Sequence, residues 1–158
     1  MKKYENVKID IVVPPYSGHL YPILELIKPL LKEEKYDICI YTGAQRKMFL
    51  KNMGIKCKVV LEDRPTFFED VANTAEKTNA FVSYSQFKKN LKVIPDIVKE
   101  LELGFKERNP DIIVADFVAV PAGVIAKKMG IPWITAIPTP FAIESKTTPP
   151  SYMGGWYP

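Results

Sequence analysis

The alternation of short apolar runs with segments of helical spacing constrains this chain most. Mainly apolar runs at 8–13, 37–41 and 55–61 are separated by segments 21–34 and 45–53, whose apolar residues recur every three or four positions. Apolar runs of this length favour strands. A recurrence of apolar residues every three or four positions favours helices in the segments between the runs. A repeated strand–helix–strand order predicts a parallel sheet with helices on both faces. We therefore expect an α/β fold with a doubly wound parallel sheet.

The same order returns in the second half of the chain. An apolar run at 112–115 closes on Asp116, and a helical segment at 120–129 leads to a last run at 132–137. We expect residues 1–137 to form one domain, which suits a chain of 158 residues.

Three prolines predict where helices begin or break. Pro22 is predicted at an early position of the first helix, where its missing N–H costs little. Pro29 predicts a break near Lys28, and Pro95 predicts a division of the helical region 81–108.

Composition excludes several classes of function. The net charge of +4 is spread along the chain, which argues against a nucleic-acid-binding protein. Cys39 and Cys57 lie in strand-like runs and are expected to be buried, reduced thiols. With a single histidine and no cysteine pair, we expect no metal site. No glycine-rich dinucleotide or phosphate-loop motif occurs, so we expect no cofactor.

No targeting or membrane segment is evident, and we expect a cytoplasmic protein. The first apolar run is interrupted by Lys8 and Asp10 and stops at Pro14, unlike a signal peptide. Four lysines of the 81–108 region could touch anionic lipid headgroups, but a solvated helix face is the simpler interpretation. They are Lys88, Lys89, Lys92 and Lys99.

The only histidine, His19, lies directly after the first predicted strand, in the stretch Ser17-Gly18-His19. In open α/β sheets, ligands bind at the loops that follow the carboxyl ends of the strands. His19 is therefore a candidate base, although a histidine can also simply fill or cap a turn.

Asp116 is the natural partner of this histidine. In a doubly wound sheet, the strand that ends at Asp116 lies beside the first strand, so Asp116 and His19 would meet at one edge. A carboxylate fixes the tautomer of a neighbouring imidazole and stabilises its protonated form. Alternatively, Asp116 only caps the following turn.

Two motifs resemble a known family. The first is the strand followed by Ser17-Gly18-His19-Leu20-Tyr21-Pro22, and the second joins Pro110-Asp111 through Asp116 to Gly130-Ile131-Pro132. Together they resemble the N-terminal, Rossmann-like domain of GT-B nucleotide-sugar glycosyltransferases. The likeness is greatest to the UDP-glycosyltransferases that modify macrolides, flavonoids and other small hydroxylated molecules.

The resemblance implies an inverting transfer of a sugar from a nucleotide-sugar, such as a UDP-sugar, to a small hydrophobic acceptor with a hydroxyl group. It implies that His19 is the general base, that Asp116 orients it, and that no metal is required. It also implies substrate-binding roles for Ser17, Gly18 and Thr139, with Ser17 near the donor phosphates and Thr139 near the donor sugar.

Three aromatic residues of the variable middle region have two interpretations. Phe81, Tyr84 and Phe87 could line the acceptor pocket, but packing in the core is the simpler expectation.

The sequence departs from the family in one respect. It carries no second Rossmann-like domain with a donor motif, and residues 138–158 form a tail rich in proline and aromatic residues without periodicity. We expect that tail to be a loop cut off before the rest of the domain, and the chain alone to be inactive. The donor would then be bound by a missing C-terminal domain or a partner chain.

Two alternatives stay open. The chain could be one subunit of a two-chain glycosyltransferase, or a non-catalytic, flavodoxin-like binding module in which His19 and Asp116 only satisfy turns.

Overall fold

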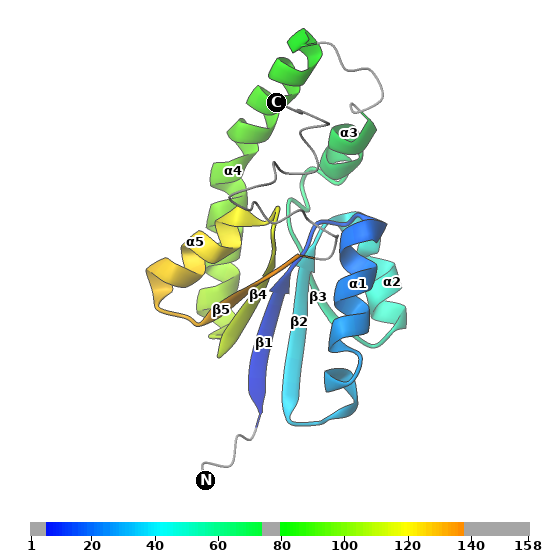
Figure 1. Cartoon of the computed structure of the whole chain (residues 1–158), viewed down its shortest axis with the longest axis vertical. Helices are drawn as coiled ribbons and strands as arrows, with labels where there is room; N and C mark the ends of the chain where they lie inside the picture. Colours follow the sequence, from blue (N-terminus) through cyan, green and yellow to red (C-terminus); the bar gives the residue numbers. More distant parts are fainter. Residues whose placement is uncertain (1–5, 74–79, 138–158) are drawn as a thin grey trace, which may run out of the picture.

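A five-stranded parallel sheet forms the centre of the protein (Figure 1). The computed structural model describes residues 6–73 and 80–137. The strand order is β3-β2-β1-β4-β5, so the direction of winding reverses between β1 and β4. The doubly wound sheet expected from the sequence is thereby confirmed. The strands are β1 (Val7–Val12), β2 (Tyr36–Thr42), β3 (Lys56–Val59), β4 (Ile112–Asp116) and β5 (Trp133–Ala136).

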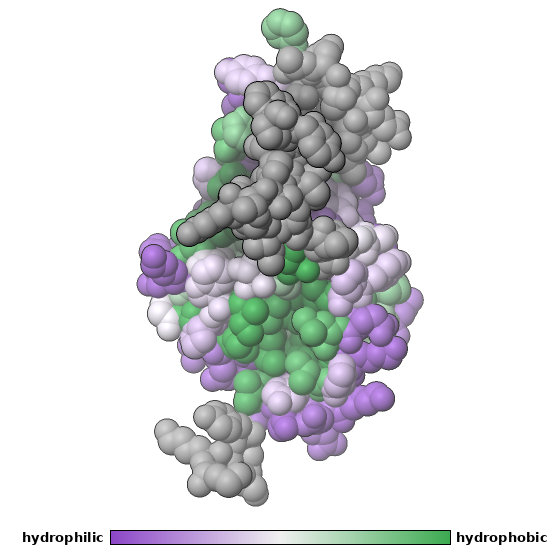
Figure 2. Space-filling view, viewed as in Figure 1, coloured by the Kyte–Doolittle hydropathy of each residue, from purple (hydrophilic) through white to green (hydrophobic). Residues whose placement is uncertain are grey.

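Helices lie on both faces of the sheet (Figure 1). Helices α1 and α2 cover one face, and α4 and α5 cover the other, whereas the short helix α3 lies beyond the carboxyl ends of the strands. Figure 2 shows an apolar area over the strands between α1 and α5. The helices are α1 (Ser17–Ile27), α2 (Lys47–Asn52), α3 (Phe67–Asn73), α4 (Ala80–Arg108) and α5 (Val120–Met129), with 3-10 turns at Leu30–Lys32 and Ala44–Arg46.

The sheet divides the core into two layers. The alternation of side chains along each strand sends every second residue to the same face. Ile9 and Ile11 of β1 pack with the buried face of α1, which is Leu20, Ile23, Leu24 and Ile27. Val12 and the alternate residues of β2 and β4 pack on the other side against α4 and α5, with Phe105 and Leu101 fully buried.

Both cysteines carry free thiols. Cys39 is buried, as expected, and burial raises the pKa of its thiol to about 11. Cys57 is only half-buried, because β3 is an edge strand of the sheet.

The three proline expectations have different outcomes. Pro29 does interrupt the first helical segment, because α1 ends at Ile27 and a 3-10 turn follows. The prediction for Pro22 is wrong: α1 begins at Ser17, so Pro22 lies inside it. The helix starts early because the Tyr16 carbonyl accepts the Leu20 N–H at 2.9 Å, which completes a turn ahead of the proline.

The predicted division at Pro95 is also wrong, since α4 runs unbroken from Ala80 to Arg108. A proline removes one backbone hydrogen bond from a helix interior. Val93 and Leu101 are buried on either side of it, and this packing favours a continuous helix.

Glycines follow the ends of two helices. Gly54 follows α2 with a φ of +72°, and Gly130 follows α5 with a φ of +68°, a backbone conformation that other residues adopt only with strain. Within the described ranges, no helix combines the length and the apolar character that crossing a bilayer requires. The tail 138–158, which includes Thr139, lies outside the described residues.

Candidate active site

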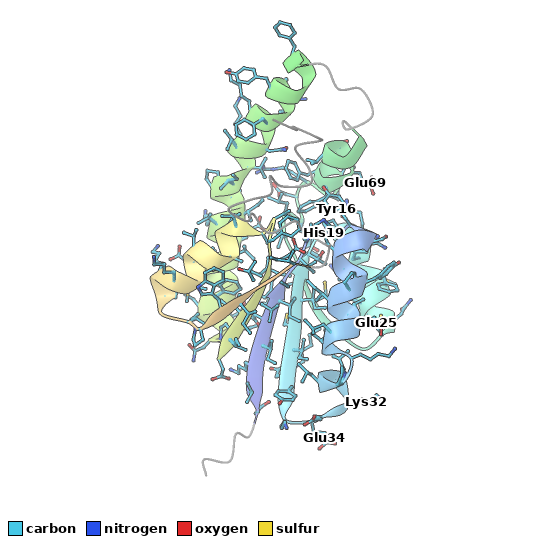
Figure 3. All side chains as sticks on the ribbon, in the orientation of Figure 1. Tyr16, His19, Glu25, Lys32, Glu34 and Glu69 are labelled. Atoms are coloured by element: carbon cyan, nitrogen blue, oxygen red, sulfur yellow. The ribbon has the colours of Figure 1, made fainter. Side chains whose placement is uncertain are left out.

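His19 lies in the first turn of α1, directly beyond the carboxyl end of β1. Its backbone N–H donates to the Tyr16 carbonyl at 3.0 Å, which fixes the start of the helix. The side chain is 19% exposed. Figure 3 shows His19 and Tyr16 close together at the carboxyl end of the sheet. The histidine is therefore held by regular structure while its ring borders open space.

Asp116, the last residue of β4, meets this histidine. The Nδ1 and Oδ2 atoms of the two side chains are 2.9 Å apart, and the Asp116 side chain is inaccessible to solvent. Its other oxygen, Oδ1, accepts the backbone N–H of Val118 at 3.0 Å. The carboxylate thus caps the turn after β4 and contacts the imidazole as well, so both sequence interpretations of Asp116 describe part of the structure.

The contact assigns the tautomer of the imidazole. A carboxylate only accepts hydrogen bonds, so Nδ1 carries the proton that His19 donates to Asp116. The second nitrogen, Nε2, then keeps its lone pair. An imidazole held in this way can take a proton at Nε2, because the neighbouring carboxylate balances the positive charge that forms.

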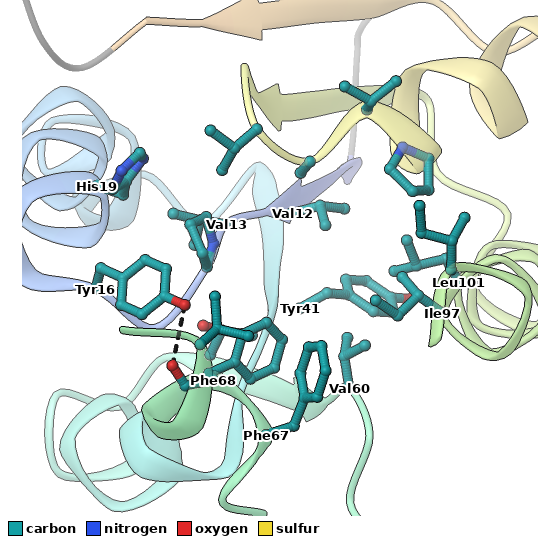
Figure 4. Close-up of a pocket in the computed structure, with 18 of the residues that line it drawn as sticks. Val12, Val13, Tyr16, His19, Tyr41, Val60, Phe67, Phe68, Ile97 and Leu101 are labelled. Atoms are coloured by element: carbon teal, nitrogen blue, oxygen red, sulfur yellow. Dashed lines mark hydrogen bonds between the residues drawn. The ribbon is translucent and has the colours of Figure 1, made fainter. Parts of the chain in front are cut away.

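Two aromatic rings hold the imidazole in place. The Phe117 ring stacks on it, with centroids 5.5 Å apart and planes 22° apart, and the Tyr16 ring meets it edge-on at 6.1 Å. The Tyr16 hydroxyl donates to the Phe68 carbonyl at 3.0 Å, which ties the start of α1 to α3 (Figure 4). Burial raises the pKa of that hydroxyl, so it stays a neutral donor.

His19 borders a cavity of about 430 Å³ (Figure 4). The carboxyl ends of β1 and β2, helix α3, one side of α4 and the segment that follows β4 surround it, and most of the lining side chains are apolar. This size falls within the range of small-molecule sites. The lining includes Val12, Val13, Tyr41, Val60, Phe67, Phe68, Ile94, Ile97, Leu101 and Val118.

Ser17 and Gly18 occupy the first two positions of α1. The Ser17 hydroxyl accepts a hydrogen bond from Nη2 of Arg46 at 2.8 Å, and Nε of Arg46 donates to the Pro15 carbonyl at 2.7 Å. Apart from its chain neighbours and the nearby backbone of its own helix, no described part of the protein lies within 4 Å of the place where a Cβ at Gly18 would stand. Sequence reasoning missed Arg46, and its only signal was a position shortly after the end of the second predicted strand.

The three aromatic residues of the middle region do not pack in the core. Phe81, Tyr84 and Phe87 are 86%, 60% and 58% exposed and none lines the cavity beside His19, so the expectation of core packing is wrong. Asn90 and Ile94, further along the same helix, do line the cavity. Among the described residues, no group of three or more acidic, histidine or cysteine side chains could hold a metal ion.

Comparison with known proteins connects this geometry to one family. No protein-family model matches the sequence. NDP-glycosyltransferase YjiC of Bacillus subtilis (strain 168) is 28% identical over 134 residues, which are 85% of this chain and 32% of that protein. The chain resembles the N-terminal part of GT-B glycosyltransferases.

Solved structures show the same fold. The glycotransferase of kitacinnamycin superposes with a TM-score of 0.65 at 24% identity, over 85% of this chain and 31% of that one. CalG4, the calicheamicin glycosyltransferase, superposes with a TM-score of 0.63 at 19% identity, over 82% and 32%. The five-stranded parallel sheet is thus that of a GT-B N-terminal domain, and the chain spans about a third of the length of these relatives.

Proposed function

We propose that this chain is the acceptor-binding part of an inverting glycosyltransferase. The observation that carries the proposal is the His19–Asp116 pair, whose free imidazole nitrogen belongs to a residue that lines an apolar cavity. A small hydrophobic acceptor would lie in the cavity with one hydroxyl group toward Nε2 of His19. The donor would be a nucleotide-sugar, as the name of the NDP-glycosyltransferase relative suggests, with a UDP-sugar as the first to test.

The proposed reaction is a single displacement. The acceptor oxygen forms a bond to the anomeric carbon of the sugar, and the bond from that carbon to the diphosphate breaks. Its electron pair leaves with the nucleoside diphosphate. The hydroxyl proton moves to Nε2 of His19, and Asp116 stabilises the resulting imidazolium through Nδ1. The configuration at the anomeric carbon inverts, because the acceptor attacks from the side opposite the leaving group.

Binding by the chain itself is the first test. We expect a neutral phenol such as 2-naphthol to bind in isothermal titration calorimetry, because the cavity lining is mostly apolar. A UDP-sugar titrated in parallel is expected not to bind, because the donor would be held by a further domain or a partner chain. Binding of neither molecule would favour a non-catalytic module over an acceptor domain.

Transfer tests the role of His19. We expect the chain joined to the donor-binding remainder of YjiC to transfer glucose from a UDP-sugar to the phenol. The substitution His19→Ala should lower kcat/KM about 10²- to 10⁴-fold, the usual contribution of a general base. Lys51→Ala, an exposed change on α2, is the matched control and should leave the rate unchanged. An equal rate for the His19 variant would refute the base. Transfer by the 158-residue chain alone would refute the division of roles.

A further inference from the structure

The first half of α4 carries an apolar stripe that stays exposed in the part of the chain that the structure describes. Its residues are large, they lie in the first half of the helix, and they are 86%, 60%, 58% and 46% exposed. They are Phe81, Tyr84, Phe87 and Leu91, called here the outer stripe. This half of α4 projects beyond the carboxyl edge of the sheet (Figure 1).

Spacing places these four residues on one side of the helix. They are separated by three, three and four positions, which is the repeat of a single helical face. The residues that pack inward from α4 lie on the adjoining side of the helix, and the two sides meet at Phe87, which is seven positions before Ile94. Val93 and Leu101 are buried in the core, and Ile97 packs against it. The apolar surface of α4 is therefore wide, and within the part of the chain that the structure describes its first half is exposed.

Lysines accompany the stripe. Lys88, Lys89 and Lys92 are exposed, and none of them forms an ion pair with another described residue. The Nζ of Lys88 lies 4.6 Å from the centroid of the Tyr84 ring. Between positions 80 and 95 there is no acidic residue. The first along the helix is Asp96, and its carboxylate is paired with Arg64. This half of α4 therefore carries uncompensated positive charge beside exposed aromatic rings.

We propose that the outer stripe and its three lysines dock on the surface of an anionic lipid bilayer. Aromatic and leucine side chains on one side of a helix, with lysines next to them, are the composition of helices that lie in the headgroup region. Lysine chains reach from an apolar boundary to the phosphates and carry their charge out of the apolar layer. Each lysine near an anionic surface adds attraction, and the effects of the three accumulate.

A protein partner fits the same surface less well. The buried centres of protein–protein interfaces are depleted in lysine, and here three lysines that pair with no described acidic residue lie near the aromatic residues. A solvated helix face, the simpler interpretation from the sequence, does not account for four large apolar side chains in one line. The proposal does not depend on the glycosyltransferase function, since it uses none of the residues around His19.

The docking has a structural consequence. The side of α4 turned toward the sheet lines the cavity with Ile94, Ile97 and Leu101. Leu91 of the stripe lies three positions before Ile94, so a bilayer held against the outer stripe would lie beside the cavity-lining side of the same helix. An apolar ligand dissolved in the bilayer would then reach the cavity without first crossing much water.

Flotation of the full chain with vesicles tests the proposal. We expect the chain to float with vesicles of phosphatidylcholine and phosphatidylglycerol at 3:1, but at least tenfold less with pure phosphatidylcholine. Binding should weaken as salt rises from 0.05 to about 0.5 M, because salt screens the attraction. The triple substitution Lys88→Glu, Lys89→Glu and Lys92→Glu should lower binding at least tenfold, and so should Phe81→Ser with Phe87→Ser.

A charge-matched variant separates a local effect from net charge. The control variant combines Lys32→Glu, Lys51→Glu and Lys127→Glu, which change the net charge by the same amount at exposed positions elsewhere. It should keep more of its vesicle binding than the α4 triple variant. Circular dichroism establishes that each variant is folded. Equal binding to both vesicle types, or an equal loss in both triple variants, would refute the proposal. Self-association without lipid that Phe81→Ser with Phe87→Ser abolishes would instead assign the stripe to a second copy of the chain.

Discussion

Each end of the sheet carries a buried aspartate in contact with a basic side chain, but the two pairs have different roles. At the carboxyl end, Asp116 of β4 contacts His19, 97 positions away in the sequence. Towards the amino end, Asp10 of β1 accepts a hydrogen bond from Nε of Arg108 at 2.7 Å, across 98 positions. Both carboxylates are almost fully buried, at 1% and 0% exposure. Burial and a long sequence separation therefore do not distinguish a candidate catalytic pair from a structural one.

The two pairs differ in whether the basic partner still has a nitrogen that could contact a ligand. The guanidinium of Arg108 stabilises the fold, because it donates to Asp10 and also to the backbone carbonyl of Asp37 at 3.1 Å. His19 contacts Asp116 with one ring nitrogen, the other has no hydrogen bond to a described residue, and the side chain lines a cavity. A residue with a free functional atom beside open space can do chemistry, whereas a saturated one can only stabilise the fold.

The electrostatics of the amino end fit a structural role. Burial raises the pKa of Asp10, and the hydrogen bond and charge of Arg108 only partly oppose that shift. A hydrogen bond from Lys56 lowers the pKa of Asp37, the second carboxylate beside Arg108. The ionised form of Asp10 is thus costly to the fold, and it depends on Arg108.

The largest effect on stability is expected for Arg108→Met. The change leaves the Asp10 carboxylate buried without its cation, so the free energy of unfolding at pH 7 should fall by about 3–5 kcal/mol. Lys106→Met, on the same helix but exposed and paired only with Glu102, is the matched control and should cost no more than about 0.5 kcal/mol. Urea unfolding measures both, and equal losses would contradict the distinction.

The pH dependence of this variant has a definite sign. An aspartate whose pKa is higher in the folded than in the unfolded state binds more protons when folded, so acid favours the fold. Loss of Arg108 raises the pKa of Asp10 further. The deficit of Arg108→Met relative to the wild type should therefore shrink as pH falls through the folded pKa of Asp10 toward its unfolded value near 3.8. A deficit that stays constant over that range would show that Asp10 is not its source.

At the carboxyl end, Asp116→Asn should affect chemistry more than stability. An asparagine can still accept the Val118 N–H, so the free energy of unfolding should fall by only about 1–2 kcal/mol. The charge that fixes and stabilises the imidazole is lost, and transfer by the joined enzyme should fall about a hundredfold. His19 is the only histidine, so its ¹⁵N resonances report directly whether the proton leaves Nδ1. An unchanged tautomer and an unchanged rate would indicate that the His19–Asp116 pair has a structural role, like the Asp10–Arg108 pair.

The sheet and the His19–Asp116 contact could be predicted because both follow from local patterns and one topological rule. Apolar periodicity gives the strands, and the reversal of strand order brings the ends of β1 and β4 together. The exact start of α1 could not be read in this way, because a proline suggested a later start and the hydrogen bonds of the first turn decided otherwise.

Long-range packing was not predictable from the same patterns. Asp10 stood out in the sequence only as a charge that interrupts an apolar run, and nothing local linked it to Arg108 at the far end of α4. The exposure of Phe81, Tyr84 and Phe87 was not predictable either, because helical spacing reveals an apolar face but not whether anything covers it. The sequence pattern gives faces and edges, and tertiary packing decides which of them are occupied.

The smallest expected effect tests the contact between the candidate site and α3. Tyr16→Phe keeps the ring that meets His19 edge-on but removes the hydroxyl that donates to the Phe68 carbonyl at 3.0 Å. The free energy of unfolding should fall by about 0.5–1.5 kcal/mol, with faster hydrogen exchange confined to α3. Binding of 2-naphthol should weaken several-fold, because Phe67 and Phe68 of α3 line the cavity. Tyr21→Phe, at a half-exposed tyrosine of α1, is the control and should change neither quantity. Faster exchange throughout the sheet would instead show that the hydroxyl stabilises the whole domain, so that the carboxyl end of the sheet would also have a structural role.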